Sequence, residues 1–423
     1  MKSIDAIAAA LQGYDPQALS VDKVNAFLHE LVQPVLANES QDVYLFDALG
    51  RVLAQDVISP ISVPAHNNSA MDGFALDASQ LKADHPLALR VVGTALAGKA
   101  WQGKVNAGEC LKIMTGAILP DGLDTVVPQE LCRVTADRIE IPAGLLRAGD
   151  NRRLCGEDLK MDSPALKKGA WVTPAAVGLL ASLGLPKVQV VRRLKVAYFS
   201  TGDEILSLGE APREGAVYDS NRYTVFGMLQ DLGCEMIDMG VVRDDPVLLE
   251  AAFTKAAQVA DAVITSGGVS VGEADFTKAM MKKLGDVAFW KIAMRPGRPM
   301  AVGRIGKSVL FGLPGNPVAV MVTFLAFVRP ALLRMMGSTA QPAPLLRAKS
   351  LEPLRKKAGR TEYQRGFVSS AADGTLQVRT TGNQGSGVLS SMVQGNGLIV
   401  LHHAQGNVAI GDEVDVMMFE GAI

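Results

Sequence analysis

Histidine and cysteine are scarce in this chain of 423 residues, which holds five histidines and four cysteines. The cysteines form no C-x-x-C pair, so the sequence predicts neither a zinc site nor a disulfide framework, which fits a reducing compartment. Apart from His402–His403, the histidines are scattered, and none lies at metal-ligand spacing from a second type of ligand. No serine–histidine–acid or cysteine-nucleophile arrangement can be argued, so carboxylates, glycine loops and cations must carry the chemistry.

A long apolar run and a charge imbalance are also missing. The longest apolar run, Val318–Val328, is interrupted by Thr323 and falls short of the roughly 20 residues that span a bilayer. A secretory signal is not visible, because the short apolar run Ala6–Leu11 follows Asp5. Lys and Arg total 42 against 43 Asp and Glu, which disfavours binding to nucleic acid or membranes through bulk charge. We therefore expect a cytoplasmic protein with no nucleic-acid or membrane partner.

The N-terminal half changes texture several times. A weakly specified leader, residues 1–20, precedes a helical pattern at 21–37. Short alternating runs separated by glycine and Asp-Gly turns then predict a β-rich insert. A second helical pattern lies within 165–184, where Thr173 can cap a helix and Pro174 fits its first turn. The predicted boundaries are 62–150 for the insert, and 20–61 with 151–191 for one elongated helical and β domain that it interrupts.

Residues 192–337 repeat a pattern in which a buried strand runs into a glycine or proline loop. The strands KVAYF, AVITS and SVLFG lead into STGDE, GGVSVGE and LPGNP, and helical patterns follow at 221–232, 246–260 and 317–330. Alternating strands and helices predict a doubly wound α/β domain with an open, parallel-type sheet. The three loops must then collect along one edge of the sheet, where ligands bind in such folds.

The C-terminal part looks different again. A linker at 338–344 leads into residues 345–423, which contain short alternating runs, many glycines and no convincing helix. This pattern predicts a small β-barrel or sandwich, of which we expect the barrel, so the expected fold is a multidomain α/β protein.

The glycine loops supply candidate binding residues. Glycines let backbone N–H groups approach an anion, and the acid Asp275 after the second loop can hold a hard cation such as magnesium. In GLPGNP, Asn316 can cap the next helix, whose N-terminus offers N–H groups to an anion, although a rigid strand–helix turn explains the motif equally well. The substrate-binding candidates in these loops are Gly267, Gly268, Ser270, Gly315 and Asn316.

Acidic residues near the strand ends form a second group of candidates. In STGDEI, Asp203 fits a capped turn, which leaves Glu204 as the site residue. Asp245 before Pro246 predicts a helix N-cap and leaves Asp244 as a metal-ligand candidate. In YDSN, the sequence favours Asn221 as a cap and Asp219 as a turn residue.

The segment KIAMRPGRP places three cations, Lys291, Arg295 and Arg298, within eight residues. A solvated face is the usual explanation of a charge run. Here a Pro-Gly turn fixes the spacing and apolar residues flank it, which favours an anion pocket facing the acidic loops. The fork of an arginine suits phosphate or another oxyanion. By contrast, Asp72 in NNSAMDGFAL and Thr115 in MTGAILPDGLDTVV fit ordinary hairpin turns by composition.

Taken in order, these motifs resemble the molybdopterin molybdenumtransferase family, to which the E domain of gephyrin is related. RRLCGEDL, FGLPGNP and EYQRG belong to the same series, and the similarity runs from about residue 20 to the C-terminus. The resemblance implies an L-shaped, four-domain subunit in a homodimer that takes adenylated molybdopterin and molybdate, releases AMP and is assisted by Mg²⁺. A molybdopterin adenylyltransferase is an implied delivery partner.

The resemblance also implies roles for particular positions. Asp244 and Asp275 would hold magnesium, and Arg295, Arg365 and Ser386 would bind the oxyanion, with Arg298 as a further substrate-binding position. The remaining catalytic positions fall on Asp72, Thr115, Asp158, Glu204 and Lys291. The family usually has lysines in its KPGKP segment, whereas this chain has Arg295 and Arg298, and the two residue types are not interchangeable at a tight site.

Two alternatives stay open at this point. A molybdopterin adenylyltransferase would resemble residues 192–336 alone and would consume ATP. A non-catalytic dimeric scaffold that binds peptide would not need the acids at five separate motif positions.

Overall fold

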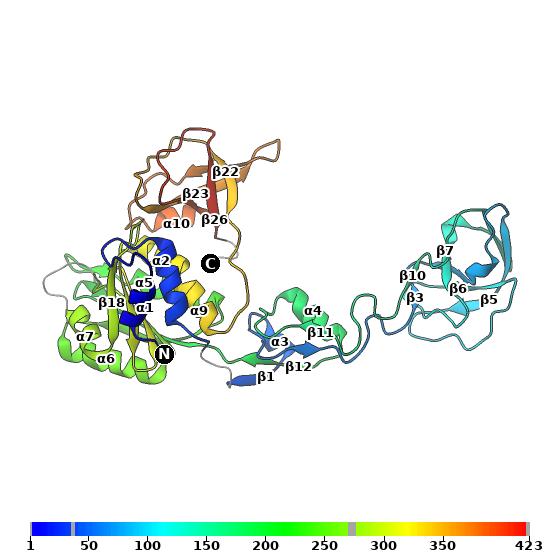
Figure 1. The fold of residues 1–423 in the computed structure, drawn as a ribbon, viewed down its shortest axis with the longest axis horizontal. Helices are drawn as coiled ribbons and strands as arrows, with labels where there is room; N and C mark the ends of the chain where they lie inside the picture. Colours follow the sequence, from blue (N-terminus) through cyan, green and yellow to red (C-terminus); the bar gives the residue numbers. More distant parts are fainter. Residues whose placement is uncertain (1, 35–38, 270–275, 420–423) are drawn as a thin grey trace.

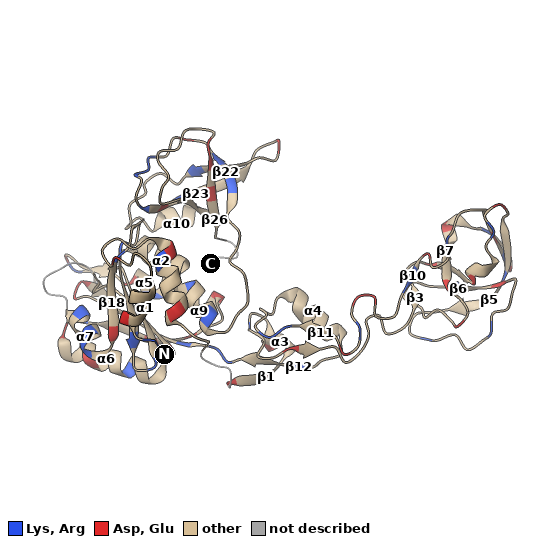
Figure 2. Cartoon of the chain, viewed as in Figure 1, with Lys and Arg blue, Asp and Glu red and all other residues tan. Residues whose placement is uncertain are grey.

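The computed structural model of the protein describes residues 2–34, 39–269 and 276–419. An α/β domain with the C-terminal barrel beside it lies at one end, a narrow elongated domain follows, and the β insert lies at the far end (Figure 1). Both signs of charge are spread over all of these parts (Figure 2). The insert is therefore remote from the α/β domain of its own chain.

The N-terminal segment contains two helices, α1 (Ile4–Ala10) and α2 (Val21–Leu31). The expectation of a weakly specified leader was wrong, because Ser3 caps α1 and its Ile4 and Ile7 side chains are buried. The predicted helix at 21–37 is also shorter than expected. It ends at Leu31 because Pro34 disfavours the α conformation at the residue before it.

The elongated domain joins chain segments from both sides of the insert. Strand β1 (Ser40–Tyr44) pairs with β12 (Lys187–Val191), and β2 (Val57–Ile58) pairs with β11 (Pro164–Leu166). Helices α3 (Leu45–Ala48) and α4 (Pro174–Ser182) complete this part. The Thr173 side chain caps α4 as predicted, but the helix begins only there, since 164–166 form a strand.

The insert is rich in β structure, as predicted. Its main sheet has the order β7-β4-β6-β5-β9-β8, and β3 pairs with β10 where the insert meets the connecting segments. The sheet buries an apolar cluster on each face. Its elements are β3 (Asn68–Ser69), β4 (Gly73–Leu76), η1 (Ala78–Gln80), β5 (Leu87–Ala95), β6 (Glu109–Ile113), β7 (Thr125–Pro128), η2 (Gln129–Leu131), β8 (Arg133–Thr135), β9 (Arg138–Ile141) and β10 (Arg152–Arg153).

The α/β domain is built on a sheet with the order β16-β13-β17-β21-β20-β18. The first four strands run parallel, and only β20 runs in the opposite direction, antiparallel to both β21 and β18, so the sheet is mixed at one edge. The tight turn at Gly306 returns the chain directly from β20 to β21, which leaves no room for a crossover helix. The strands are β13 (Lys195–Thr201), β14 (Ile205–Leu206), β15 (Val217–Tyr218), β16 (Glu235–Val242), β17 (Ala262–Ser266), β18 (Asp286–Lys291), β20 (Pro299–Ile305) and β21 (Ser308–Leu313).

Helices cover both faces of this sheet, which confirms the doubly wound prediction. Alternate β13 side chains show it: Ala197 and Phe199 pack with α6 and α7, whereas Val196 and Tyr198 pack with α5 and the helical run after β21. The helices are α5 (Ser220–Asp231), α6 (Pro246–Val259), α7 (Phe276–Leu284), α8 (Pro317–Thr323), the π-helical turn η3 (Phe324–Val328) and α9 (Arg329–Met335). The run Pro317–Met335 is long and apolar enough to cross a membrane, but 78% of its most apolar window is buried inside the protein, as in a core helix.

The C-terminal domain is a closed barrel, as predicted. Its strands pair in the order β23-β24-β22-β26-β25, and β25 pairs back to β23. A short helix, α10 (Ser390–Gln394), corrects the expectation of no helix here. A two-residue strand from the α/β domain, β19 (Met294–Arg295), extends this sheet by pairing with β23. The barrel strands are β22 (Leu346–Ser350), β23 (Thr361–Ser370), β24 (Leu376–Thr380), β25 (Gly397–Leu401) and β26 (Glu413–Met418).

Candidate functional site

The predicted glycine loops meet at the carboxyl ends of β13, β17 and β21. The chain crosses from β16 to the other side of β13 to form β17, so this edge is the switch point of the sheet, where α/β folds bind ligands. Gly267 has a φ of +94°, and a Cβ added there would lie 2.5 Å from the Thr201 carbonyl oxygen. A Cβ added at Gly315 would lie 3.9 Å from the Gly267 Cα. The loops after the three strands are therefore in contact, and Gly268 packs against Thr277 in the same way.

We expect Gly267→Ala to lower the free energy of unfolding by at least about 2 kcal/mol, because it adds backbone strain and a clash with Thr201. Urea denaturation followed by circular dichroism measures the change. Gly306→Ala is the matched control, since Gly306 also has a positive φ (+59°) but its added Cβ would meet nothing within 4 Å. If both variants lost the same free energy of unfolding, the close approach of the loops would not contribute to stability.

A buried network of hydroxyl groups lies beneath these loops. The Tyr198 hydroxyl contacts Ser200 Oγ at 2.9 Å and Ser266 Oγ at 2.8 Å, and Ser200 Oγ donates to Asp219 Oδ1 at 2.8 Å. Burial raises the pKa of Asp219, and it also raises the pKa of Tyr198. The network explains how polar groups at the strand ends are tolerated inside the domain.

The two polar residues of YDSN have roles other than those predicted. Asp219, not Asn221, caps α5 by accepting from the Arg222 backbone N–H. The Asn221 side chain is buried and donates from Nδ2 to the Gly315 carbonyl at 2.7 Å, which anchors the third loop. An aspartate directly before a helical pattern is a recognised capping signal, and it was available in the sequence.

The predicted acids lie on neighbouring loops. The Asp244 backbone N–H donates to Asp203 Oδ1 at 3.3 Å, so the loop after β16 meets the loop after β13 that carries Glu204. The Glu204 carboxylate folds over Gly202, where an added Cβ would lie 2.5 Å from Oε2. Asp245 caps α6 as predicted. Asp275 and Ser270 lie outside the described residues, and within the described ranges no group of three or more metal-ligating side chains is assembled.

The basic segment follows β18 and enters the barrel sheet. Lys291 ends β18 and is partly buried, whereas Arg295 and Arg298 are exposed. Arg295 lies on β19, opposite Glu362 of β23. Gly297 has a φ of +90° and packs against Thr323, so the turn predicted between the two arginines is present.

Arg365 is the cation with the most constrained surroundings. It is 1% exposed, and its guanidinium donates from Nε to Ser391 Oγ at 2.9 Å and from Nη2 to the carbonyls of Asn383 at 3.2 Å and Gly385 at 2.9 Å. Burial, and then the nearby charge of Arg295, lower the pKa of Arg365 to about 10. It therefore stays charged at neutral pH.

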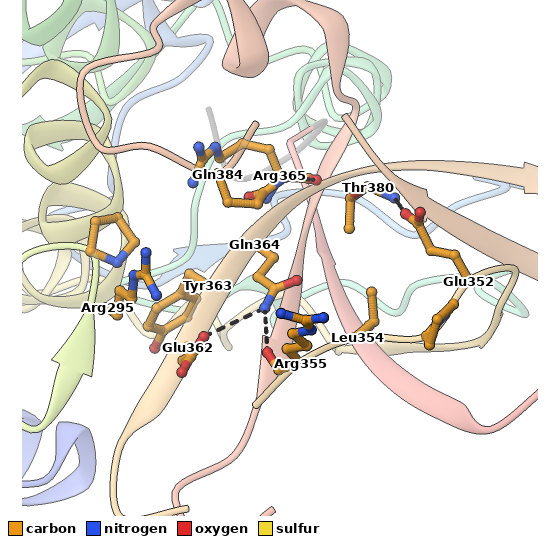
Figure 3. A pocket seen from close by; sticks show the side chains of 12 residues that line it. Arg295, Glu352, Leu354, Arg355, Glu362, Tyr363, Gln364, Arg365, Thr380 and Gln384 are labelled. Atoms are coloured by element: carbon orange, nitrogen blue, oxygen red, sulfur yellow. Dashed lines mark hydrogen bonds between the residues drawn. The ribbon is translucent and has the colours of Figure 1, made fainter. Parts of the chain in front are cut away.

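Arg295 and Arg365 line a common pocket of about 260 Å³, together with Glu362, Gln364 and Gln384 (Figure 3). Glu362 is paired with Arg360 at 2.7 Å. Among the residues that the structure describes, neither Arg295 nor Arg365 forms an ion pair with a carboxylate. Arg355 and Glu352 also line the pocket, so three arginines face two acids, and Glu362 is already engaged by Arg360. The positive balance makes the pocket attractive to an anion.

Ser386 links this pocket to the glycine loops. Asn316 Nδ2 donates to Ser386 Oγ at 3.0 Å, and the Val318 N–H donates to the Ser386 carbonyl at 3.1 Å. Two expectations about α8 therefore need correction: the Asn316 side chain does not cap the helix, and one of the N–H groups expected to face an anion is already used. The contacts run without a break from Gly267 through Gly315, Asn316 and Ser386 to Gly385 and Arg365.

Asp72 and Thr115 come together in the insert but lie far from this series. The backbone N–H and the Oγ1 of Thr115 both donate to Asp72 Oδ1 at 2.7 Å, and these bonds lower the pKa of Asp72. Asp158 is exposed in the segment that connects the insert to the elongated domain, where its N–H donates to the Val63 carbonyl at 3.1 Å. Figure 1 shows the insert at the opposite end of the molecule from the α/β domain and the barrel.

We expect Thr115→Val to raise the pKa of Asp72, yet to leave it below the ordinary value, because the backbone bond has the larger effect and remains. A depressed folded-state pKa contributes stability above the unfolded pKa, and this contribution is lost as the pH falls through the folded pKa. The variant should therefore lose the contribution at a higher pH. An NMR titration of the Asp72 carboxyl measures the shift, and an unchanged titration would contradict the assigned bond.

Comparison with known proteins covers nearly the whole chain. Family models match residues 19–184 (MoeA N-terminal region, domain I and II), 197–334 (probable molybdopterin binding domain) and 347–419 (MoeA C-terminal region, domain IV). A molybdopterin molybdenumtransferase from Haemophilus influenzae is 41% identical over 95% of this chain and 98% of its own length. A Nostoc protein of the same name is 33% identical over 96% and 95%.

Solved structures show the same arrangement. A MoeA protein of molybdopterin biosynthesis from Pyrococcus horikoshii superposes with a TM-score of 0.80 at 26% identity, covering 95% of this chain and all of that one. A second Pyrococcus MoeA structure gives a TM-score of 0.72 at 30% identity and covers 95% and 99% of the two chains.

Proposed function

The chain belongs to the molybdopterin molybdenumtransferase family, whose members insert molybdenum during cofactor biosynthesis, and we propose that it takes molybdate and adenylated molybdopterin and releases AMP. The observation that supports this most is the unbroken series of contacts between the Gly267 loop and the Arg295–Arg365 pocket. A phosphate-bearing pterin and an oxyanion would then bind at adjoining sites along this series.

The cationic end of the series suits molybdate. An anion between Arg295 and Arg365 relieves their mutual repulsion and compensates the burial of the Arg365 charge away from water. Arg365 has a fixed orientation, since its bonds to Ser391, Asn383 and Gly385 hold the guanidinium plane. A preorganised donor does not have to be reoriented when the anion arrives. Ser386 and Arg298 complete the proposed oxyanion-binding group.

The glycine end suits the phosphates and the pterin. Gly267, Gly268 and Gly315 bring the backbone close enough for a ligand to contact exposed amides. Glu204 lies at the same sheet edge, and Lys291 ends the strand that leads into the basic segment. We assign Lys291 to stabilising the charge that develops on the departing phosphate.

The acids at the same edge have the donor chemistry for magnesium. Asp244 and Asp203 lie on touching loops, and carboxylate oxygen is the ligand that this hard cation prefers. Asp244 and Asp275 are the proposed ligands, although Asp275 lies outside the described residues. When bound, the ion would neutralise charge on the phosphate oxygens.

A homodimer would reconcile the position of the insert with its proposed role. The insert, which carries Asp72 and Thr115, lies at the opposite end of its own chain from the α/β domain in Figure 1. A second copy could present its insert to that domain, and most soluble homo-oligomers are symmetric dimers. We further propose a cytoplasmic location and delivery of the pterin by a molybdopterin adenylyltransferase.

The direct test is incubation of the protein with adenylated molybdopterin and Mg²⁺, with and without molybdate. We expect AMP release that depends on molybdate and a pterin product that contains molybdenum. Consumption of ATP with unadenylated molybdopterin would instead identify an adenylyltransferase. Absence of both reactions, together with tight binding of a peptide, would identify a scaffold.

A further inference from the structure

The segment that carries Lys291, Arg295 and Arg298 is held from two directions. On one side, the Thr361 N–H of β23 donates to the Ala293 carbonyl at 2.9 Å, and β19 pairs with β23. On the other side lie residues 14–19, which we call the N-terminal clamp. They come from a part of the chain more than 270 positions away, and all of them except Leu19 precede the region matched by the family models, which begins at residue 19.

The clamp contacts the basic segment through backbone hydrogen bonds. The Lys291 N–H donates to the Pro16 carbonyl at 2.8 Å, and the Ala293 N–H donates to the Leu19 carbonyl at 2.7 Å. A parallel bridge pairs Leu19 with Ile292. The clamp thus acts as a short extra strand along the residues that follow β18, and it fixes the direction in which Lys291 leaves the sheet.

Aromatic packing holds the clamp in place. Trp290, next to Lys291 and 2% exposed, donates from Nε1 to the Tyr14 hydroxyl at 2.9 Å. The Phe27 ring of α2 packs against Trp290 in a T-shaped contact at 4.8 Å and stacks on Tyr14 at 6.2 Å. Leu19 is 1% exposed in the same cluster. The clamp is therefore anchored to the α/β core at both ends.

A hydrogen bond within the basic segment transmits the restraint imposed by the clamp to the two arginines. The Ile292 N–H donates to the Arg298 carbonyl at 2.7 Å, so the segment returns on itself between the clamp and the Gly297 turn. Displacing the clamp would release the N–H groups of Lys291 and Ala293 on either side of that bond. The cations of the segment would then lose one of their two supports, with β23 as the other.

We propose that the N-terminal clamp is a positioning element for the oxyanion and phosphate site, acting through the backbone of the basic segment. The inference rests on the proposed function, because it takes these cations to be the ones that bind molybdate. Its residues touch no reacting group, so its removal should weaken binding of the oxyanion while the fold and the pterin end of the site persist.

The test compares two shortened chains. One lacks residues 2–19 and keeps Ser20, the cap of α2, whereas the control lacks residues 2–11 and keeps the clamp. Calorimetry with molybdate alone measures anion affinity. We expect a loss of at least about tenfold in the first chain and little change in the control, because two backbone hydrogen bonds are removed only in the first. In turnover assays, KM for molybdate should rise and kcat should fall, because the clamp also supports Lys291, while KM for adenylated molybdopterin stays constant.

A synthetic peptide of residues 1–20 added to the chain lacking 2–19 should restore the affinity for molybdate. Tyr14→Phe in the full chain provides a second measurement if the shortened chain fails to fold. It should weaken molybdate binding by about threefold through loss of one hydrogen bond, and Tyr44→Phe, at an exposed position of the elongated domain, should not.

Unchanged affinity in both the shortened chain and Tyr14→Phe would overturn the clamp and leave the proposed function intact. Equal losses in the two shortened chains would overturn it as well, since they would assign the effect to α1. A full-length protein that neither binds molybdate nor releases AMP would overturn the proposed function itself.

Discussion

Arg365→Lys is expected to lower kcat/KM for molybdate-dependent AMP release by about 100-fold, because a lysine cannot replace a buried guanidinium that makes three separate hydrogen bonds. The ammonium group would lose the fixed orientation that Ser391 and the 383–385 carbonyls impose. Steady-state kinetics with varied molybdate measure the loss, which should fall mainly on KM for molybdate.

Arg379→Lys is the matched control for this prediction. Arg379 lies on β24 of the same barrel, where its guanidinium packs over the ring of Phe367 at 5.7 Å, away from the pocket. We expect its kinetics to match the wild type within about twofold, as for surface substitutions in general. An Arg365→Lys protein as active as Arg379→Lys would place the oxyanion elsewhere.

Two inactive variants are expected to restore activity when they form a mixed dimer. Asp72→Asn disables the insert, and Lys291→Ala disables the α/β side of the site. If each site combines the insert of one subunit with the α/β domain of the other, random mixing makes half the dimers hybrid, each with one intact site. The mixture should therefore show about a quarter of wild-type activity.

The control pairs Asp72→Asn with Thr115→Ala. These residues share one hydrogen-bonded unit in the insert, so no mixed dimer can contain an intact insert, and the activity should stay at the level of the separate variants. Co-expression with two affinity tags isolates the hybrid dimers for assay. Absence of recovery in the hybrid of Asp72→Asn with Lys291→Ala would rule out a site shared between subunits.

The fold was largely predictable because local signals agreed with the global arrangement. KVAYF, AVITS and SVLFG are buried strands with loops at one sheet edge, and the caps Thr173 and Asp245 begin helices where the sequence indicated. The antiparallel edge was missed because β20 and β21 are joined by a turn at Gly306, and the apolar runs alone carry no direction.

The site was predictable in its members but less so in its contacts. Gly267, Gly315 and Asn316 were named from composition, yet the attachment of Asn316 to Ser386 crosses 70 positions of sequence and leaves no local pattern. Ser200 was expected to supply a hydroxyl, but the buried network that joins it to Tyr198 and Ser266 was missed, because polar residues in a strand look like surface positions until the sheet is assembled. The roles assigned to the site residues stay predictions.

The pairing of β19 with β23 has a consequence for how such chains can be recombined. Two residues of the α/β domain are woven into the barrel sheet, and a shift of one position would turn Arg295 to the opposite face. A chimera that takes its barrel from one homologue and its α/β domain from another must therefore preserve the pairing of β19 with β23 residue for residue. Exchange of the barrel or the α/β domain without this pairing would give two folded domains in which Arg295 is wrongly placed.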